Sequence, residues 1–377
     1  MRWRTALKGM KPYTPGKSID EVKELYGLDE VVKLASNENP YGTVPAVKDH
    51  FATGHIDFEI YPDGYAGNLR KAMSEKLGVS EDTLIFGSGS DEIIVLIARA
   101  LLGPGTNTIA ATPTFPQYAH HAMIEGATVQ EVPLVDGAHD LAGFLEAIDE
   151  NTSVIWLCSP NNPTGSLIKH EELIAFLDKI PETILVVIDE AYYEYIVDES
   201  YVNTVSVAGL YSNVIVLRTF SKAYGLAAFR VGYGISSPSI ISNLDTVRSP
   251  FNITPAGLEL AEKSLEDDQF IEECRALNRE QMERFKQFAA SNNLHIFDSE
   301  ANFVLIEVPG SANETTEKFL SHGFIVRSGD ALGMPGYIRV TVGTETQNTG
   351  FFKVFDAILE GVGQDKLKRT FQSLELA

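Results

Sequence analysis

Short, unbroken apolar runs alternate with helical patterns through the middle of this chain, and this alternation restricts the fold more than any other feature of the sequence. The runs lie at 84–86, 108–111, 154–157, 184–188, 214–217 and 231–235. A strand with one face in water alternates apolar and polar residues, whereas continuous Val, Ile and Leu runs are typical of strands buried on both faces. The pattern therefore predicts an α/β protein with a mostly parallel central sheet flanked by helices.

The C-terminal part of the chain has a different pattern. A long charged helical pattern at 255–288 is followed there by three apolar runs, at 302–306, 324–327 and 337–340. We interpret it as a smaller α+β unit, since 377 residues exceed one ordinary core. The N-terminal segment has weak periodicity and could belong to either unit; we assign it to the smaller one. The expected division is a large domain at 46–254 and a small domain made of 1–45 with 255–377.

Charge and cysteine content exclude several classes of function. Lys and Arg number 30 against 52 Asp and Glu, so the net charge of -22 repels nucleic acid and anionic membranes. Cys158 and Cys274 lie far apart and form no CxxC motif, so neither a zinc site nor a disulfide framework is indicated. No apolar stretch reaches membrane-spanning length. We expect a cytoplasmic protein without a metal.

Lys222 follows the apolar run at 214–217 by a few residues. A single lysine is most often a solvated surface charge. At the end of a buried strand, however, desolvation lowers the pKa of the ammonium and makes the amine a Schiff-base nucleophile toward an aldehyde, such as that of pyridoxal phosphate. We therefore ask whether the other strand ends carry what that cofactor requires.

Asp189, Tyr192 and Asn162 lie just after the apolar runs at 184–188 and 154–157. The carboxyl ends of parallel strands form the edge where open α/β sheets bind ligands. An aspartate at a strand end is usually a cap or half of an ion pair, but a pyridine nitrogen also needs such a carboxylate to stay protonated. Tyr192 is close enough in sequence to hydrogen-bond the phenolic oxygen of the ring.

Ser90 and Asp91 begin a predicted helix directly after the run at 84–86 and the glycines that follow it. The free N–H groups of a helix start favour an anion such as phosphate, although a plain capped helix explains the same residues. Arg230 offers the bidentate fork that phosphate prefers, and a surface ion pair is its simpler explanation. Glu92 replaces the third glycine of a dinucleotide fingerprint, which argues against a dehydrogenase.

Three motifs together, SPNNPTG at 159–165, DEAYYEY at 189–195 and TFSKAYGLAAFRVGYG at 219–234, closely resemble fold-type I pyridoxal-phosphate aminotransferases. The resemblance runs along nearly the whole chain. It implies that Lys222 carries the cofactor covalently, that Asp189 pairs with the ring nitrogen, and that Asn162 and Tyr192 hold the ring oxygen. The other cofactor contacts that it implies are Ser90, Asp91, Ser221 and Arg230 around the phosphate and Phe115 stacked on the ring. Many relatives have Tyr at 115, Gly at 228 and Leu at 229, where this chain has Phe115, Ala228 and Phe229.

Further segments, at 11–17, 34–42, 61–64, 325–329 and 338–344, are similar to the histidinol-phosphate aminotransferase family. This resemblance implies that Arg339 clamps the α-carboxylate of glutamate and, with Arg327 and Tyr13, receives the phosphate of histidinol phosphate beside Asn162. It also implies that Tyr61 reaches the cofactor phosphate of a neighbouring subunit in a homodimer. The implied reaction is transamination of L-histidinol phosphate with 2-oxoglutarate to imidazole-acetol phosphate and L-glutamate, in histidine biosynthesis.

Other functions stay open at this stage. An aromatic-lined pocket that accepts imidazole also suits a broad-specificity aromatic amino acid aminotransferase, and the phosphothreonine decarboxylase family resembles this chain as well. Transcription regulators with a related fold carry an added DNA-binding domain, and no basic helix-turn-helix segment precedes the catalytic pattern here. His120 and His121 lack metal-ligand spacing, so we assign them no role.

Overall fold

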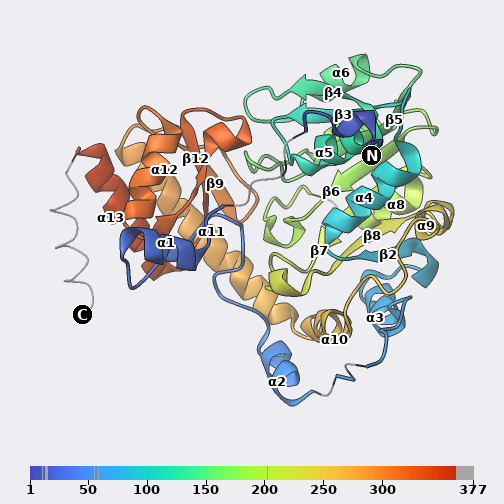
Figure 1. Cartoon of the computed structure of the whole chain (residues 1–377), viewed down its shortest axis with the longest axis horizontal. Helices are drawn as coiled ribbons and strands as arrows, with labels where there is room; N and C mark the ends of the chain where they lie inside the picture. The colour runs from blue at the N-terminus through green and yellow to red at the C-terminus, as the bar shows by residue number, and fades with distance from the viewer. Residues whose placement is uncertain (11, 13–15, 55, 58, 202, 362–377) are drawn as a thin grey trace.

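The computed structural model describes residues 1–10, 12, 16–54, 56–57, 59–201 and 203–361. Figure 1 shows two lobes, a larger one around β2 to β8 and a smaller one around β9 and β12. Within the described residues, every helix is too short or too polar to cross a membrane.

The larger lobe is built on a seven-stranded sheet in the order β2-β8-β7-β6-β5-β3-β4. β8 runs in the direction opposite to the other six strands, so the predicted mostly parallel sheet is confirmed. The strands are β2 (Leu84–Gly87), β3 (Asn107–Thr112), β4 (Thr128–Pro133), β5 (Thr152–Cys158), β6 (Leu185–Asp189), β7 (Val214–Thr219) and β8 (Gly232–Ser236).

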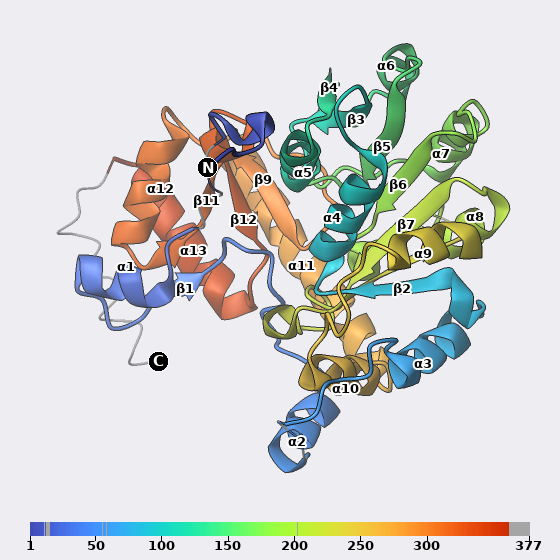
Figure 2. The same ribbon diagram turned by 45° about the vertical axis from the view of Figure 1, so that its right-hand side comes forward.

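Helices cover both faces of this sheet because successive strand residues point to opposite sides. In β5, Ile155 and Leu157 join one core cluster, while Val154 and Trp156 join the other. Figure 2 shows α4, α5 and α9 on one side of the fan of strands and α6, α7 and α8 on the other. The helices of this lobe are α2 (Pro45–Thr53), α3 (Gly67–Leu77), α4 (Ser90–Leu101), α5 (Gln117–Glu125), α6 (Leu141–Glu146), α7 (His170–Leu177), α8 (Thr204–Leu210), α9 (Pro238–Asp245) and α10 (Pro255–Ser264), with short 3-10 turns at Glu81–Thr83, Tyr193–Tyr195 and Ala227–Phe229.

Two elements differ from the sequence-based expectation. β4 was not among the predicted strands, because it lies at the sheet edge and only Val132 of its residues is buried. The single helical pattern at 255–288 is two helices, α10 and α11 (Asp268–Ser291). The side chain of Asp267 accepts a hydrogen bond from the Phe270 amide, and this cap starts the second helix.

The smaller lobe combines an antiparallel sheet, β11-β12-β9, with the parallel pair β1-β10. Its apolar core includes Phe285, Phe319 and Phe351. The strands and remaining helices are β1 (Val32–Lys33), β9 (Phe303–Glu307), β10 (Phe324–Ile325), β11 (Arg327–Ser328), β12 (Tyr337–Thr341), α1 (Ile19–Tyr26), α11, α12 (Ala312–Ser321) and α13 (Glu345–Leu359), with a 3-10 turn at Gly329–Leu332.

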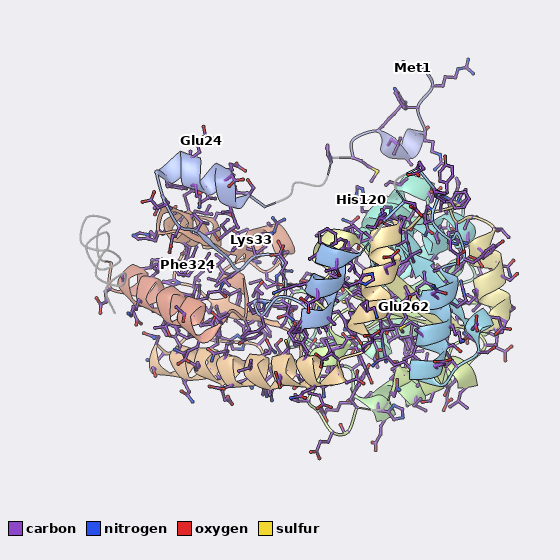
Figure 3. The ribbon with its side chains drawn as sticks, turned by 90° about the horizontal axis from the view of Figure 1, so that it is seen from below. Met1, Glu24, Lys33, His120, Glu262 and Phe324 are labelled. Carbon is purple, nitrogen blue, oxygen red and sulfur yellow. The ribbon has the colours of Figure 1, made fainter. Side chains whose placement is uncertain are left out.

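The N-terminal segment touches both lobes. β1 pairs with β10 in the smaller lobe. The 3-10 turn η1 (Thr5–Leu7) lies against α5 of the larger lobe, where Arg4 forms an ion pair of 2.8 Å with Glu125. Figure 3 shows Met1 on the same side of the molecule as His120 of α5. The domain boundaries expected from the sequence stay a prediction. The expected boundary at 255 comes just before α10, whose Leu260 and Ala261 pack in the core of the larger lobe.

Candidate functional site

The polar residues that follow β5, β6 and β7 meet at one edge of the sheet, because these three strands are parallel neighbours. Asp189 is the last residue of β6, opposite Cys158 of β5. Lys222 comes three residues after β7, and Asn162 comes four residues after β5. The fold therefore places an amine, a carboxyl group and an amide at the edge where open α/β sheets bind ligands.

Asp189 is buried, with 3% of its surface exposed. Its Oδ2 accepts a hydrogen bond of 2.6 Å from the Tyr118 hydroxyl, and its Oδ1 accepts one of 3.2 Å from the Ala191 amide. Burial raises the pKa of this carboxyl group to about 6, although the Tyr118 hydrogen bond opposes the rise. A carboxyl group of this kind is suited to hold a positively charged N–H partner.

The amine of Lys222 donates a hydrogen bond of 3.0 Å to the Ser36 carbonyl and lies 5.7 Å from the centroid of the Tyr192 ring. Burial lowers the pKa of Lys222 to about 8, and the positive charge of Arg339 adds to this effect. With that pKa, about a tenth of the side chain is a neutral amine at pH 7. Lys222 is therefore a nucleophile near neutral pH.

Tyr192 and Asn37 form a buried polar pair beside this amine. The Asn37 amide donates a hydrogen bond of 3.0 Å to the Tyr192 hydroxyl. The hydroxyl thus accepts from Asn37 and keeps its own proton for a further acceptor. Burial raises the pKa of Tyr192, so that proton is retained at neutral pH.

Arg339 connects the smaller lobe to the sheet edge. Its Nη1 donates to the Asn162 Oδ1 at 2.6 Å and its Nη2 to the Ala35 carbonyl at 2.7 Å. Its guanidinium carbon lies 5.3 Å from the centroid of the Phe303 ring. These contacts hold the guanidinium in place. Because Arg339 bonds the side-chain oxygen of Asn162, the amide nitrogen of Asn162 can donate a hydrogen bond to a ligand.

Arg327 and Arg339 lie directly opposite each other in the antiparallel pair β11-β12. Directly opposite residues of an antiparallel pair project from the same face, about 4.5–5.5 Å apart at Cβ. Two like charges in that position repel each other, and a bound anion would reduce the repulsion. An anion such as a phosphate or a carboxylate is the kind of ligand that suits such a pair.

The start of α4 and the segment after β7 form a second cationic place. Arg230 donates a hydrogen bond of 3.1 Å to the Ser221 hydroxyl and lies 3.5 Å from the Asp91 carboxylate. Ser90, the first residue of α4, is buried. Gly89 has φ of 76°, and a Cβ there would lie 2.5 Å from Arg230 Nη2, so this approach requires glycine. All four residues predicted around a phosphate are therefore neighbours.

The departures at 228 and 229 lie in the turn η4 (Ala227–Phe229), which leads into Arg230. Arg230 itself has φ of 54°, a left-handed conformation. The Phe229 ring packs edge-on against Phe51 at 5.7 Å between centroids. With Ala228 and Phe229 in this turn, the Arg230 guanidinium contacts Ser221 and Asp91.

The remaining predicted residues are placed differently. The Phe115 ring, just before α5, contacts Tyr118 edge-on, with 5.5 Å between centroids. Tyr61 lies away from this cluster: its surface is 78% exposed and its ring stacks on Phe251 at 4.8 Å. Tyr13 lies outside the described residues. The roles assigned to all these residues stay predictions.

Two residues of the site were missed from the sequence. Tyr118 bonds Asp189 from α5, and no local pattern links those two positions. Asn37 has φ of 56°, a conformation that asparagine tolerates better than most residues, and it holds Tyr192 from the other lobe. Asn37 could have been found from the sequence, because it lies in the segment 34–42 that resembles the family.

Comparisons with known proteins show which family the chain resembles. Residues 29–355 match the family described as aminotransferase class I and II. The chain is 50% identical over 359 residues to a histidinol-phosphate aminotransferase of Geobacillus thermodenitrificans, which covers 95% of this chain and 98% of that protein. It is 51% identical over 360 residues to the enzyme of that name from Bacillus subtilis (strain 168), covering 95% and 100%. A crystal structure of histidinol-phosphate aminotransferase from Sinorhizobium meliloti in complex with pyridoxal-5'-phosphate superposes with a TM-score of 0.87, 26% identity and coverage of 96% and 98%.

Proposed function

The chain belongs to the class I and II aminotransferases, and we propose from that premise that it transfers the amino group of L-histidinol phosphate to 2-oxoglutarate. The products are imidazole-acetol phosphate and L-glutamate, so the enzyme serves histidine biosynthesis. The near-full-length likeness to relatives of that activity carries the proposal. The opposed Arg327 and Arg339 support it, because both a phosphate and a carboxylate are anions that such a pair can bind.

The proposed cofactor is pyridoxal 5'-phosphate, and the residues at the sheet edge fit it. The cofactor supplies an aldehyde that bonds an amine and a pyridine ring that withdraws electrons. Lys222, with its pKa near 8, is the amine for that aldehyde. Asp189 is the buried carboxyl group for the ring nitrogen, and Arg230 with Ser221 binds the phosphate.

Each protein group then has a defined task. Lys222 as a free amine would take the proton from the substrate Cα in the first half of the reaction, and in the second half it would deliver a proton to the Cα of the second substrate. Tyr192 and Asn162 would donate hydrogen bonds to the ring oxygen, and Phe115 would stack on the ring. Ser90 and Asp91, at the start of α4, complete the surroundings of the phosphate.

Substrate recognition belongs to Arg339, with Arg327 and Tyr13. Arg339 has 7% of its surface exposed, and its contacts with Asn162 and the Ala35 carbonyl orient it before a ligand arrives. In a chain of net charge -22, a local cationic pair is what attracts an anionic substrate. One anion pocket then serves both glutamate and histidinol phosphate.

We further propose a homodimer in which Tyr61 reaches the site of the partner. Tyr61 stacks on Phe251, and these two rings have 78% and 46% of their surfaces exposed. Tyr65, four residues after Tyr61, is 70% exposed. Exposed aromatic rings that lie together are typical of protein interfaces, which supports the proposal. Two buried free cysteines, Cys158 and Cys274, are consistent with work in the cytoplasm.

The substrate proposal is tested by offering histidinol phosphate, phenylalanine and phosphothreonine to one preparation with 2-oxoglutarate. We expect the highest kcat/KM for histidinol phosphate. A higher value for phenylalanine would indicate a broad aromatic aminotransferase, and release of carbon dioxide from phosphothreonine would indicate a decarboxylase.

The dimer proposal is tested by mixing two inactive variants, Lys222→Ala and Tyr61→Ala. A mixed dimer would contain one site with Lys222 from one subunit and Tyr61 from the other. Recovery of activity after the two variants are unfolded and refolded together supports composite sites. Failure to recover activity, or a monomer in light scattering of the unaltered protein, contradicts them.

A further inference from the structure

Tyr118 is the centre of a fully buried column of side chains beneath the site. Its ring stacks on Trp156, with 4.9 Å between centroids and 10° between the planes. The Trp156 indole N–H donates to the Thr108 hydroxyl at 2.7 Å, and that hydroxyl donates to the Val154 carbonyl at 2.7 Å. These contacts fix the Tyr118 ring, so its hydroxyl has one position.

That position is against Asp189. Asp189 and Cys158 lie opposite each other at the ends of β6 and β5, and the Tyr118 hydroxyl donates to Asp189 Oδ2 at 2.6 Å. Oδ1 accepts a weaker, longer bond from the Ala191 amide. The carboxylate is therefore held in a single orientation by a side chain and a main-chain donor.

We propose that Tyr118 is a positioning residue that keeps Asp189 ionised and oriented. The proton between the Asp189 carboxylate and the ring nitrogen of the cofactor then stays on the nitrogen. This inference rests on the proposed binding of pyridoxal phosphate with Asp189 at its ring nitrogen. Tyr118 also contacts Phe115, the residue proposed to stack on the ring, so one tyrosine supports two cofactor contacts.

The surroundings of Asp189 show why a donor is needed. Burial, and the negative charges of Asp91 and Glu190, all raise the pKa of Asp189 and favour its neutral form. The Tyr118 hydroxyl is the side-chain group that opposes them. A neutral Asp189 would keep the proton for itself, and the ring would withdraw electrons less strongly.

The test uses the Tyr118→Phe holoenzyme, reconstituted with pyridoxal phosphate that carries ¹⁵N at the ring nitrogen. The ¹⁵N chemical shift reports how much of the nitrogen is protonated, which a purely structural role of the tyrosine does not change. A lost hydrogen bond to a charged group corresponds to about a tenfold fall in the ratio of protonated to unprotonated nitrogen at fixed pH. Tyr211→Phe is the matched control, because Tyr211 makes a bond of the same 2.6 Å length to Asp178 at the surface.

Several results would overturn the inference. An unchanged shift in Tyr118→Phe, or an equal change in Tyr211→Phe, contradicts the role of Tyr118 alone. An unprotonated nitrogen in the unaltered enzyme contradicts the proposed role of Asp189 as well. If Tyr118→Phe does not fold, 3-fluorotyrosine at 118 keeps the ring and makes the hydroxyl a stronger donor; the protonated fraction should then rise, and a constant or lower fraction contradicts the inference.

Discussion

The two sides of the site differ in the kind of charge that they carry. On the larger lobe, burial moves the pKa of Asp189 up to about 6 and that of Lys222 down to about 8. On the smaller lobe, Arg327 and Arg339 carry guanidinium groups, which stay protonated in proteins. Groups whose protonation changes near neutral pH suit covalent and proton chemistry, whereas permanent charges suit recognition. We therefore expect proton chemistry to belong mainly to the larger lobe and recognition of the substrate anion mainly to the smaller lobe.

Removing the amine of Lys222 should abolish catalysis. We expect Lys222→Ala to lower kcat/KM for histidinol phosphate by more than about 10⁴-fold, because it removes both the covalent anchor and the proton carrier. Borohydride trapping followed by mass spectrometry should find no pyridoxal adduct on the chain. Lys318→Ala, an exposed lysine of α12, is the control. Near-normal turnover of Lys222→Ala would refute the assignment.

Arg339→Ala should weaken substrate binding more than it lowers the rate of the chemical steps. We expect the apparent KM to rise about a hundredfold for both glutamate and histidinol phosphate, since each loses a buried charged partner. Arg339→Lys should recover part of the loss, because it keeps the charge and loses the fork. Steady-state kinetics with each substrate measure this effect. If neither KM changes, Arg339 does not belong to the substrate site.

The smallest expected effect concerns the stability of the cofactor-free protein. The pKa of Asp189 is raised from 3.8 to about 6 by folding, so the folded state holds a proton between these pH values that the unfolded state has lost. Stability therefore falls as pH rises through this window, by up to about 3 kcal/mol above pH 6. Asp189→Asn removes this cost.

Urea unfolding at pH 8, 6 and 4 tests this sign. Cofactor-free Asp189→Asn should be more stable than the unaltered protein at pH 8, and the difference should close toward pH 4. Asp178→Asn removes an exposed aspartate that also accepts a tyrosine hydroxyl, so it controls for the lost carboxylate. A difference that does not vary with pH would show that Asp189 is not in a desolvated environment.

The sequence predicted the strands that carry an unbroken apolar run, and it missed β4 and the break between α10 and α11. The six central apolar runs correspond to strands of the sheet, because burial on both faces leaves an unbroken apolar signal. β4 carries no such signal because its edge position exposes most of its residues. The break between α10 and α11 was missed because the charged pattern continues through 265–267.

The sequence by itself determined the positions of Lys222, Asp189 and Arg230, because each belongs to a motif whose spacing from a buried strand is local. Only the tertiary structure decided what holds them. Tyr118 reaches Asp189 across 71 positions and Asn37 reaches Tyr192 across 155, and Arg339 bonds Asn162 from the other lobe. Which residues become partners over such distances in sequence depends on how the strands and helices pack, and no local sequence pattern indicates it.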